Sequence, residues 1–157
     1  MSDAIPHFRL LGTPGLDQFG LRVVGYQCTY HPRLERADSH WLMIRGEVIR
    51  EDRRWHFVDP CLVTGELADL IVWLRALPHL SGPLSFMESR LKFEHVEGES
   101  PWLVRVTLRG DALPALLGLS FEERWYDGVP LELDTTPEQV QRVVAGLEED
   151  MKRLPPR

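Results

Sequence analysis

Short stretches of alternating apolar and polar residues recur along the chain, which is the pattern of a half-buried β-strand. In the stretch 102–109 (WLVRVTLR), Trp102, Val104, Val106 and Leu108 share one face. The same reasoning predicts strands at residues 20–30, 41–50, 53–59, 84–88 and 90–96, with weaker candidates at 120–126 and 130–134. The stretch 41–50 is apolar on both faces and is therefore expected to be a central strand.

Two other stretches have the spacing of an amphipathic helix. The first begins at Thr64, which is placed to cap the helix, and ends at Leu77, because Pro78 cannot continue it. The second follows Thr136-Pro137-Glu138-Gln139, a capping box with proline at the first helical position. These signals predict helices at about 64–77 and 137–154. The apolar stripes are Leu67, Leu70, Ile71, Leu74 and Leu77 in the first helix, and Val140, Val143, Val144, Leu147 and Met151 in the second.

The order of these elements is several strands, a helix, several strands and a helix, which favours an α+β fold. Short turns join successive strands, and hairpin connections give antiparallel pairs. We therefore expect a single domain over residues 1–157, with a strongly bent antiparallel β-sheet of about seven to eight strands and two packed α-helices. A chain of 157 residues, 43% of them hydrophobic, is long enough to bury a core without a disulfide or a metal.

Composition and charge limit the cellular location and the classes of partner that we expect. No apolar run approaches the length of about 20 residues that a spanning helix needs, and the first residues show no basic segment followed by an apolar one. We expect a cytoplasmic protein with no membrane partner. The net charge is −6, because 11 acids and 11 bases balance over residues 1–93, whereas 13 acids face 7 bases over residues 94–157. This acidic balance disfavours nucleic acid as a partner and suits docking onto a basic protein.

The sequence offers few candidates for catalytic or metal chemistry. It contains no phosphate-binding glycine loop, no GxSxG, no HExxH and no CxxC. A metal site from Cys28, His31 and His40 is conceivable on two strands, but the short ligand spacing typical of zinc sites is missing. We therefore expect neither a metal nor a cofactor.

The segment Asp59-Pro60-Cys61-Leu62 has two interpretations. In the catalytic one, Cys61 is a nucleophile and His56 is its base. In the structural one, Pro60 fixes a turn at the exit of a strand, Asp59 binds the free amides of that turn, and Cys61 packs as a small apolar side chain. The structural interpretation is favoured, because the two candidate catalytic residues lie on one continuous stretch that runs from strand to helix.

The stretch from His40 to Leu77 contains HWLMIRGEV followed by WHFVDPCLVTGELADLIVWLRAL. It resembles the WapI family of bacterial immunity proteins, whose pattern is a tryptophan-led strand ending in GEV, a W-x-F-x-D-P-C-L-x-T turn and an E-L-x-x-L-x-x-W-L helix. LSFMESRLKFE (84–94) and the closing acidic helix also fit. The chain departs from the pattern at Gly65, where the family has tryptophan, and the first 20 residues and the stretch 111–126 lie outside the resemblance.

The resemblance implies a non-enzymatic protein that protects its cell by binding a polymorphic toxin, in the founding case one that cleaves RNA. A nuclease toxin presents a positive surface, so the acidic C-terminal part of this chain is the predicted interface. The predicted toxin-binding residues there are Glu122, Glu123, Trp125, Tyr126 and Asp127. The alternative interface is the first helix around Asp69 and Trp73, whose indole is expected to be exposed because it lies off the apolar stripe. The alternative function is a small-ligand-binding domain or an enzyme that uses a cleft in the curved sheet.

Overall fold

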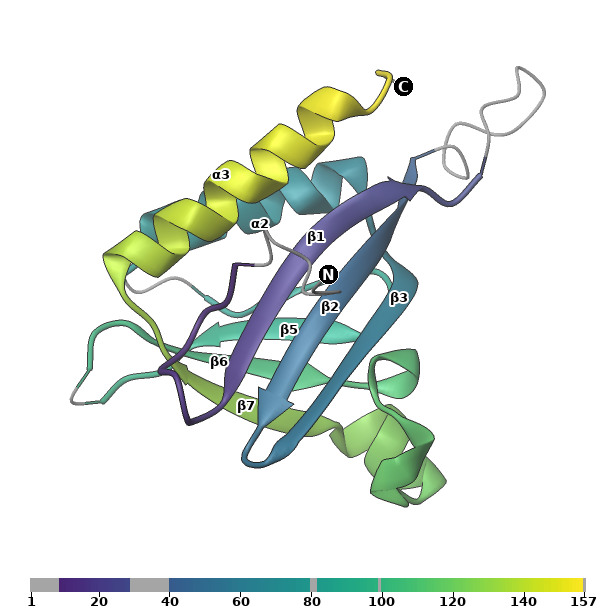
Figure 1. The fold of residues 1–157 in the computed structure, drawn as a ribbon, viewed down its shortest axis with the longest axis vertical. Coiled ribbons are helices and arrows are strands. Elements are labelled where there is room, and N and C mark those ends of the chain that lie inside the picture. Colours follow the sequence, from purple (N-terminus) through teal and green to yellow (C-terminus); the bar gives the residue numbers. More distant parts are fainter. Residues whose placement is uncertain (1–8, 29–39, 80–81, 99, 157) are drawn as a thin grey trace, which may run out of the picture.

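The computed structural model describes residues 9–28, 40–79, 82–98 and 100–156, and their strands form two antiparallel sheets (Figure 1). The first sheet has the order β1-β2-β3, with β1 at Gln18–Tyr26, β2 at Trp41–Arg50 and β3 at Arg53–Val63. The second has the order β4-β5-β6-β7, with the bounds Leu84–Ser85, Leu91–His95, Leu103–Leu108 and Val129–Asp134. Two long helices, α2 (Thr64–Ala76) and α3 (Pro137–Arg153), lie side by side, with α3 packed against β1 of the first sheet. The predicted α+β class is confirmed, with the strands divided between two sheets.

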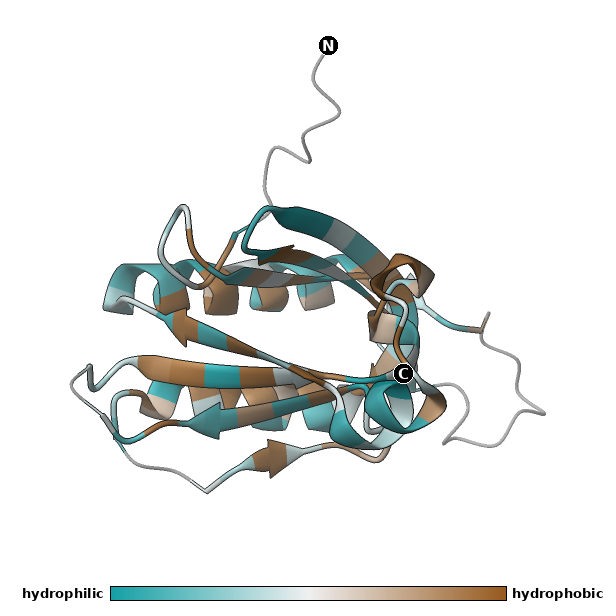
Figure 2. Ribbon diagram, turned by 90° about the horizontal axis from the view of Figure 1, so that it is seen from below, coloured by the Kyte–Doolittle hydropathy of each residue, from teal (hydrophilic) through white to brown (hydrophobic). Residues whose placement is uncertain are grey.

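The two sheets and the two helices share one hydrophobic core. Figure 2 shows hydrophobic stretches on strands of both sheets and along the helices. Phe93 of β5 lies at the centre of this core, with its ring centroid 6.3 Å from that of Phe19 in β1, 6.0 Å from that of Trp73 in α2 and 6.1 Å from that of Phe86. One ring of the second sheet therefore contacts the first sheet and a helix at once.

A glycine of the first sheet makes room for an aromatic ring. Gly46 of β2 pairs with Phe57 of β3, and a Cβ added to Gly46 would lie 2.2 Å from Cζ of the Phe57 ring. Any larger residue at position 46 would displace this buried ring. The spacing of Gly46 and Phe57 in the sequence thus reflects one close contact across a strand pair.

Helix α3 begins as its sequence predicts. The backbone N–H of Gln139 donates to Oγ1 of Thr136 at 3.2 Å, and Pro137 occupies the first turn. The Gln139 side chain has a different role from the predicted capping box. It donates to the carbonyl oxygen of Gly12 at 2.9 Å and accepts from the N–H of Gly12 at 3.0 Å. The start of α3 is therefore attached to the segment that precedes β1.

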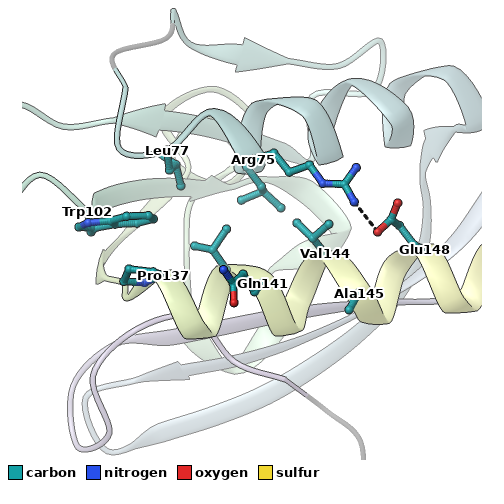
Figure 3. Close-up of a pocket in the computed structure, with 10 residues that line it drawn as sticks. Arg75, Leu77, Trp102, Pro137, Gln141, Val144, Ala145 and Glu148 are labelled. Atoms are coloured by element: carbon teal, nitrogen blue, oxygen red, sulfur yellow. Dashed lines mark hydrogen bonds and ion pairs between the residues drawn. The ribbon is translucent and has the colours of Figure 1, made fainter.

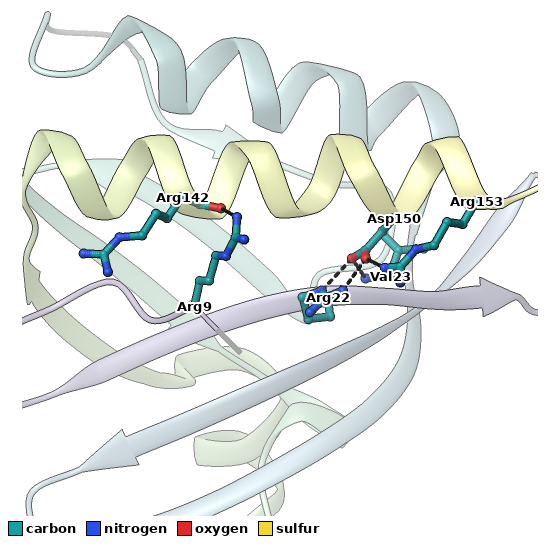
Figure 4. Close-up of polar contacts among 6 residues, drawn as sticks. All are labelled: Arg9, Arg22, Val23, Arg142, Asp150 and Arg153. Carbon is teal, nitrogen blue, oxygen red and sulfur yellow. Dashed lines mark hydrogen bonds and ion pairs between the residues drawn. The ribbon is translucent and has the colours of Figure 1, made fainter. Parts of the chain in front are cut away.

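A carboxylate near the end of α3 fixes this helix to β1 (Figure 4). Oδ2 of Asp150 accepts from Nε of Arg22 at 2.8 Å and from the backbone N–H of Val23 at 2.9 Å. Its other oxygen pairs with both Arg22 and Arg153. The Asp150 side chain has no exposed surface, so these hydrogen bonds replace the water it loses on folding.

The prediction of a turn at Asp59-Pro60-Cys61-Leu62 is wrong, because β3 continues through it to Val63 and α2 begins at the next residue. The pairing of β2 with β3 shifts register between Leu42 and Ile44, so Met43 lies opposite both Pro60 and Cys61. Such a bulge tolerates a proline, whose missing N–H would break a regular ladder.

The predicted cap of α2 is also wrong. The N-cap residue is Val63, whose backbone N–H donates to Oε1 of Glu66 at 3.1 Å. Thr64 is the first helical residue, and its hydroxyl lies 3.0 Å from Nδ1 of His40. Because the strand leads into the helix without a turn, the threonine hydroxyl binds a neighbouring loop and does not cap the helix.

Two strand predictions differ from the structure. The stretch 84–88 contains only the short strand β4, and the stretch 120–126 is helical from Phe121 onward. The weaker candidate at 130–134 is confirmed as β7. No helix in the described part of the chain is long and apolar enough to cross a membrane.

Candidate functional site

The stretch between β6 and β7 forms a small lobe at one end of the sheets, at residues 110–128 (Figure 1). This 110–128 lobe contains two short 3₁₀ turns, η1 (Gly110–Ala112) and η2 (Ala115–Leu117), and a π-helical turn, η3 (Glu123–Asp127). It contains four acids and one base, Asp111, Glu122, Glu123, Asp127 and Arg124, so its net charge is −3. The predicted toxin-binding residues of the C-terminal part therefore lie on this lobe.

The helical turn of the lobe starts with a capping box that the strand prediction overlooked. The N–H of Glu123 donates to Oγ of Ser120 at 3.2 Å, and the N–H of Ser120 donates to Oε1 of Glu123 at 3.3 Å. The turn then widens, since the N–H of Gly128 reaches the carbonyl of Glu123 at 2.8 Å. π-Helical turns of this kind are frequent at functional sites. The sequence Ser120-x-x-Glu123 was the signal for this helix.

The lobe exposes large apolar side chains beside carboxylates. Leu116, Phe121 and Tyr126 are 70%, 67% and 69% exposed. The rings of Phe121 and Tyr126 meet edge to face with centroids 6.0 Å apart. Glu122 and Asp127 are exposed on the same turn. We call the residues Leu116, Phe121, Glu122, Tyr126 and Asp127 the lobe patch.

Of the predicted interface residues, Glu122, Glu123, Tyr126 and Asp127 are exposed on this turn, whereas Trp125 is partly buried. The Trp125 indole packs on Gly110, where an added Cβ would lie 2.5 Å from Cζ3 of the ring, and Gly110 has a φ of 58°. Trp125 therefore anchors the lobe from inside. Sequence reasoning did not single out Leu116 or Phe121, which the expected alternation placed in or near a strand.

Hydrogen bonds attach the lobe to the body of the protein. The indole N–H of Trp55 in β3 donates to the carbonyl of Ala112 at 3.0 Å. Arg109 donates from Nε to the carbonyl of Tyr126 at 2.9 Å. Within the lobe, Arg124 donates to the carbonyl of Leu113. Since carbonyl groups along the lobe are held in this way, the lobe patch is presented on a supported backbone.

The alternative interface on α2 is not assembled as expected. Asp69 is exposed, but Trp73 is only 6% exposed, so its predicted exposure is wrong. The Trp73 indole N–H donates to the carbonyl of Gly82 at 2.9 Å, and its ring packs against Phe93. Because α2 is covered on two sides, Trp73 is buried although it lies just beside the main apolar stripe.

The arrangement around Cys61 does not favour a nucleophile. Cys61 has no exposed surface, and its Sγ lies 3.6 Å from Oδ2 of Asp59. Burial, and then the neighbouring Asp59 carboxylate, raise the pKa of the Cys61 thiol far above its ordinary value. His56 is exposed on β3, whereas Cys61 is buried. Asp59, whose pKa burial also raises despite the nearby Arg90, contacts Cys61 and does not bind turn amides.

This predicts an unreactive thiol. In the variant Cys28→Ser, which leaves Cys61 as the only cysteine, Ellman's reagent should modify the native protein only as fast as the protein opens, and rapidly once guanidinium chloride unfolds it. Absorbance at the thionitrobenzoate band measures both rates. Rapid modification of the native Cys28→Ser protein would contradict the structural interpretation of Cys61.

Metal ligands do not gather in the described part of the chain. Among those residues, no three His, Cys, Asp or Glu side chains are placed to hold a metal ion. Of the three residues weighed for a site, His31 lies outside the described residues, and His40 contacts Thr64.

A groove runs between α2 and α3, with a volume of about 370 Å³ (Figure 3). Its lining includes Leu77, Trp102 and Val144, and the ion pair of Arg75 with Glu148, 2.6 Å long, spans the two helices beside it. This groove lies between two helices, whereas the alternative function placed a cleft in the curved sheet. This groove contains no buried charged group that would select a ligand.

The comparisons with known proteins give one result. The model of the immunity protein WapI-like family matches residues 9–155. This match includes the 110–128 lobe, which the resemblance seen in the sequence left out. No curated protein and no solved structure matches the chain. Because the match spans nearly the whole sequence, the chain belongs to the WapI-like immunity protein family.

Proposed function

We propose that this protein works in the cytoplasm, where it neutralises a basic nuclease toxin by binding it through the 110–128 lobe. Membership of the family supports an immunity-type, non-enzymatic function, which implies binding to a cognate toxin protein. The observation that carries the choice of surface is the lobe patch, in which Phe121 and Tyr126 are exposed between carboxylates.

The composition of the lobe patch suits a protein partner. Large aromatic side chains are enriched among the residues that dominate binding energy, and contiguous exposed apolar patches mark interaction sites. A single exposed apolar residue would need no explanation, but here Phe121 and Tyr126 touch each other on a capped turn. The rings therefore supply an anchor of defined shape.

The charge of the lobe suits a nuclease. An enzyme that cleaves nucleic acid must attract phosphate, so its active surface is positive. A lobe with a net charge of −3 would be drawn to such a surface and would compete with the nucleic acid for it. The carboxylates then accelerate association, whereas the two aromatic rings, once buried against the toxin, slow dissociation.

We expect the two rings to control dissociation. The partner to test is the C-terminal domain of the protein encoded immediately upstream, produced as an inactive variant and immobilised for surface plasmon resonance. Phe121→Ser and Tyr126→Ser should each increase the dissociation rate by about 30-fold, which corresponds to a hot spot of about 2 kcal/mol. Val72→Ser is the matched control, since Val72 is equally exposed, at 67%, on α2. Absence of binding by the unmodified protein would contradict the proposed function.

We expect the carboxylates to control association. The double variant Glu122→Lys/Asp127→Lys should associate more slowly and with a weaker dependence on salt, because it removes the attraction between opposite charges. Glu123 is left unchanged because its carboxylate caps the turn. The control Glu97→Lys/Glu149→Lys reverses two exposed acids outside the lobe. Equal association rates for the two double variants would place the interface on another surface, such as the exposed side of α2 around Asp69.

A further inference from the structure

Arg90 lies directly before β5 and contacts three carboxylates from three parts of the fold. Its Nε is 3.5 Å from Oδ2 of Asp59 in β3, its Nη1 is 3.3 Å from Oε2 of Glu88, and its Nη2 is 3.3 Å from Oδ2 of Asp111 in the lobe. The Arg90 side chain is only 19% exposed. One guanidinium thus connects the first sheet, the second sheet and the 110–128 lobe.

The same guanidinium also packs on the tryptophan that supports the lobe patch. Its Cζ lies 5.0 Å from the centroid of the Trp125 ring, within the range of a cation–π interaction. The Trp125 ring also contacts Gly110, which has room for it only because glycine lacks a Cβ. Trp125 directly precedes Tyr126 and its ring lies 6.4 Å from that of Phe121. The position of the indole therefore sets the position of both exposed rings.

We propose that Arg90 is a positioning residue for toxin binding, one that holds the lobe patch in its binding arrangement through Trp125 and Asp111. This inference rests on the proposed function. Lysine replaces arginine only in part here, because an ammonium group lacks the planar fork that meets three carboxylates beside the indole. A lobe that is ordered before it meets its partner binds more tightly than one that must be ordered on binding.

The experiment compares Arg90→Met and Arg90→Lys with the unmodified protein against the same immobilised upstream domain. We expect Arg90→Met to weaken binding at least about tenfold and Arg90→Lys to restore only part of the loss. Arg45→Met is the matched control, because Arg45 is also partly buried and paired with Glu47 but lies in β2. Each variant is first shown to be folded at the assay temperature by circular dichroism.

A double-mutant cycle separates positioning from a general loss of stability. If Arg90 acts through the lobe patch, Arg90→Met should weaken binding much less when Phe121→Ser is already present. Additive effects, or binding by Arg90→Met at the unmodified level, would overturn the inference. If Phe121→Ser itself has no effect, the proposed interface fails instead, and the two failures are distinguished.

Proteolysis of the free protein tests the positioning without a toxin. Chymotrypsin cleaves after aromatic residues, and cleavage after Phe121 and Tyr126 requires the lobe to open locally. Arg90→Met should accelerate cleavage at these two sites about tenfold relative to Arg45→Met, as followed by mass spectrometry. Equal rates in the two variants would show that Arg90 does not hold the lobe, whatever the partner.

Discussion

The variant Phe93→Ala should lose about 3–5 kcal/mol of its free energy of unfolding, the usual cost of removing a large buried ring. Phe93 is 1% exposed, and its ring contacts β1, α2 and the segment after β4 through Phe19, Trp73 and Phe86. Alanine would leave a cavity that these rings cannot fill together, because each belongs to a different element. Urea unfolding followed by tryptophan fluorescence and circular dichroism measures the change.

Phe121→Ala is the matched control, because it removes an equal ring that is 67% exposed. Phe121→Ala should lower the free energy of unfolding by about 0.5 kcal/mol or less, as is usual for surface positions. This loss is about a tenth of that expected for Phe93→Ala. Equal losses of stability in the two variants would contradict the burial of Phe93 in a core that both sheets share.

Periodicity along the chain predicted both helices and most of the strands, and the short turns predicted the antiparallel pairs, but not the division of the strands between two sheets. Helix α3 has a regular apolar stripe, a threonine cap and a terminating pair of prolines, so local signals agree over its whole length. Alternation in β6 shows which side chains are buried. It does not show that β3 and β5 belong to different sheets, since this depends on contacts such as that between Phe19 and Phe93, far apart in sequence.

The errors in the site prediction have local physical causes. Alternation of apolar and polar residues at 120–126 favoured a strand, but the capping box at Ser120 and Glu123 makes the segment helical. Trp73 was expected to be exposed because it lies off the stripe of α2, yet this helix packs against both α3 and the core. Arg90 gave no sequence signal at all, because its three carboxylate partners come from three separate segments.

The family pattern can now be explained by contacts. Gly46 in the GEV strand faces Phe57 in the W-x-F-x-D stretch, and Trp55 in the same stretch donates to the lobe at Ala112. Pro60 lies at a β-bulge of β3, and the next residue, Cys61, is buried in the core. These matched residues therefore build the fold and orient the lobe.

Asp150→Ala should lower the free energy of unfolding by about 3–5 kcal/mol, as is typical when one partner of a buried ion pair is removed. Alanine takes away the acceptor that Arg22 and the backbone N–H of Val23 share, and with it the attachment of α3 to β1. Glu148→Ala is the matched control, because it removes the exposed ion pair with Arg75, and exposed pairs contribute about 1 kcal/mol or less. Equal losses in the two variants would contradict the buried role of Asp150.

Acid should remove the contribution of Asp150. Desolvation is the largest single influence and raises the pKa of this carboxyl, but the hydrogen bonds from Arg22 and Val23 and the charge of Arg22 together outweigh it, so the pKa is lowered. The unfolded chain then binds the proton at higher pH than the folded one. The stabilisation is complete above the unfolded value of about 4 and is lost as the pH falls through the lowered folded value.

Urea unfolding at a series of pH values, from about 6 down to the onset of acid unfolding, should therefore show a steeper fall in stability for the unmodified protein than for Asp150→Asn. Asparagine keeps the shape of the side chain and an acceptor for Arg22 but has no proton to bind in this range. Asp59, whose pKa is raised by burial, contributes in the opposite direction but is present in both proteins, so it cancels from the difference. Parallel curves for the two proteins would show that the Asp150 carboxylate is not held in its charged form by Arg22.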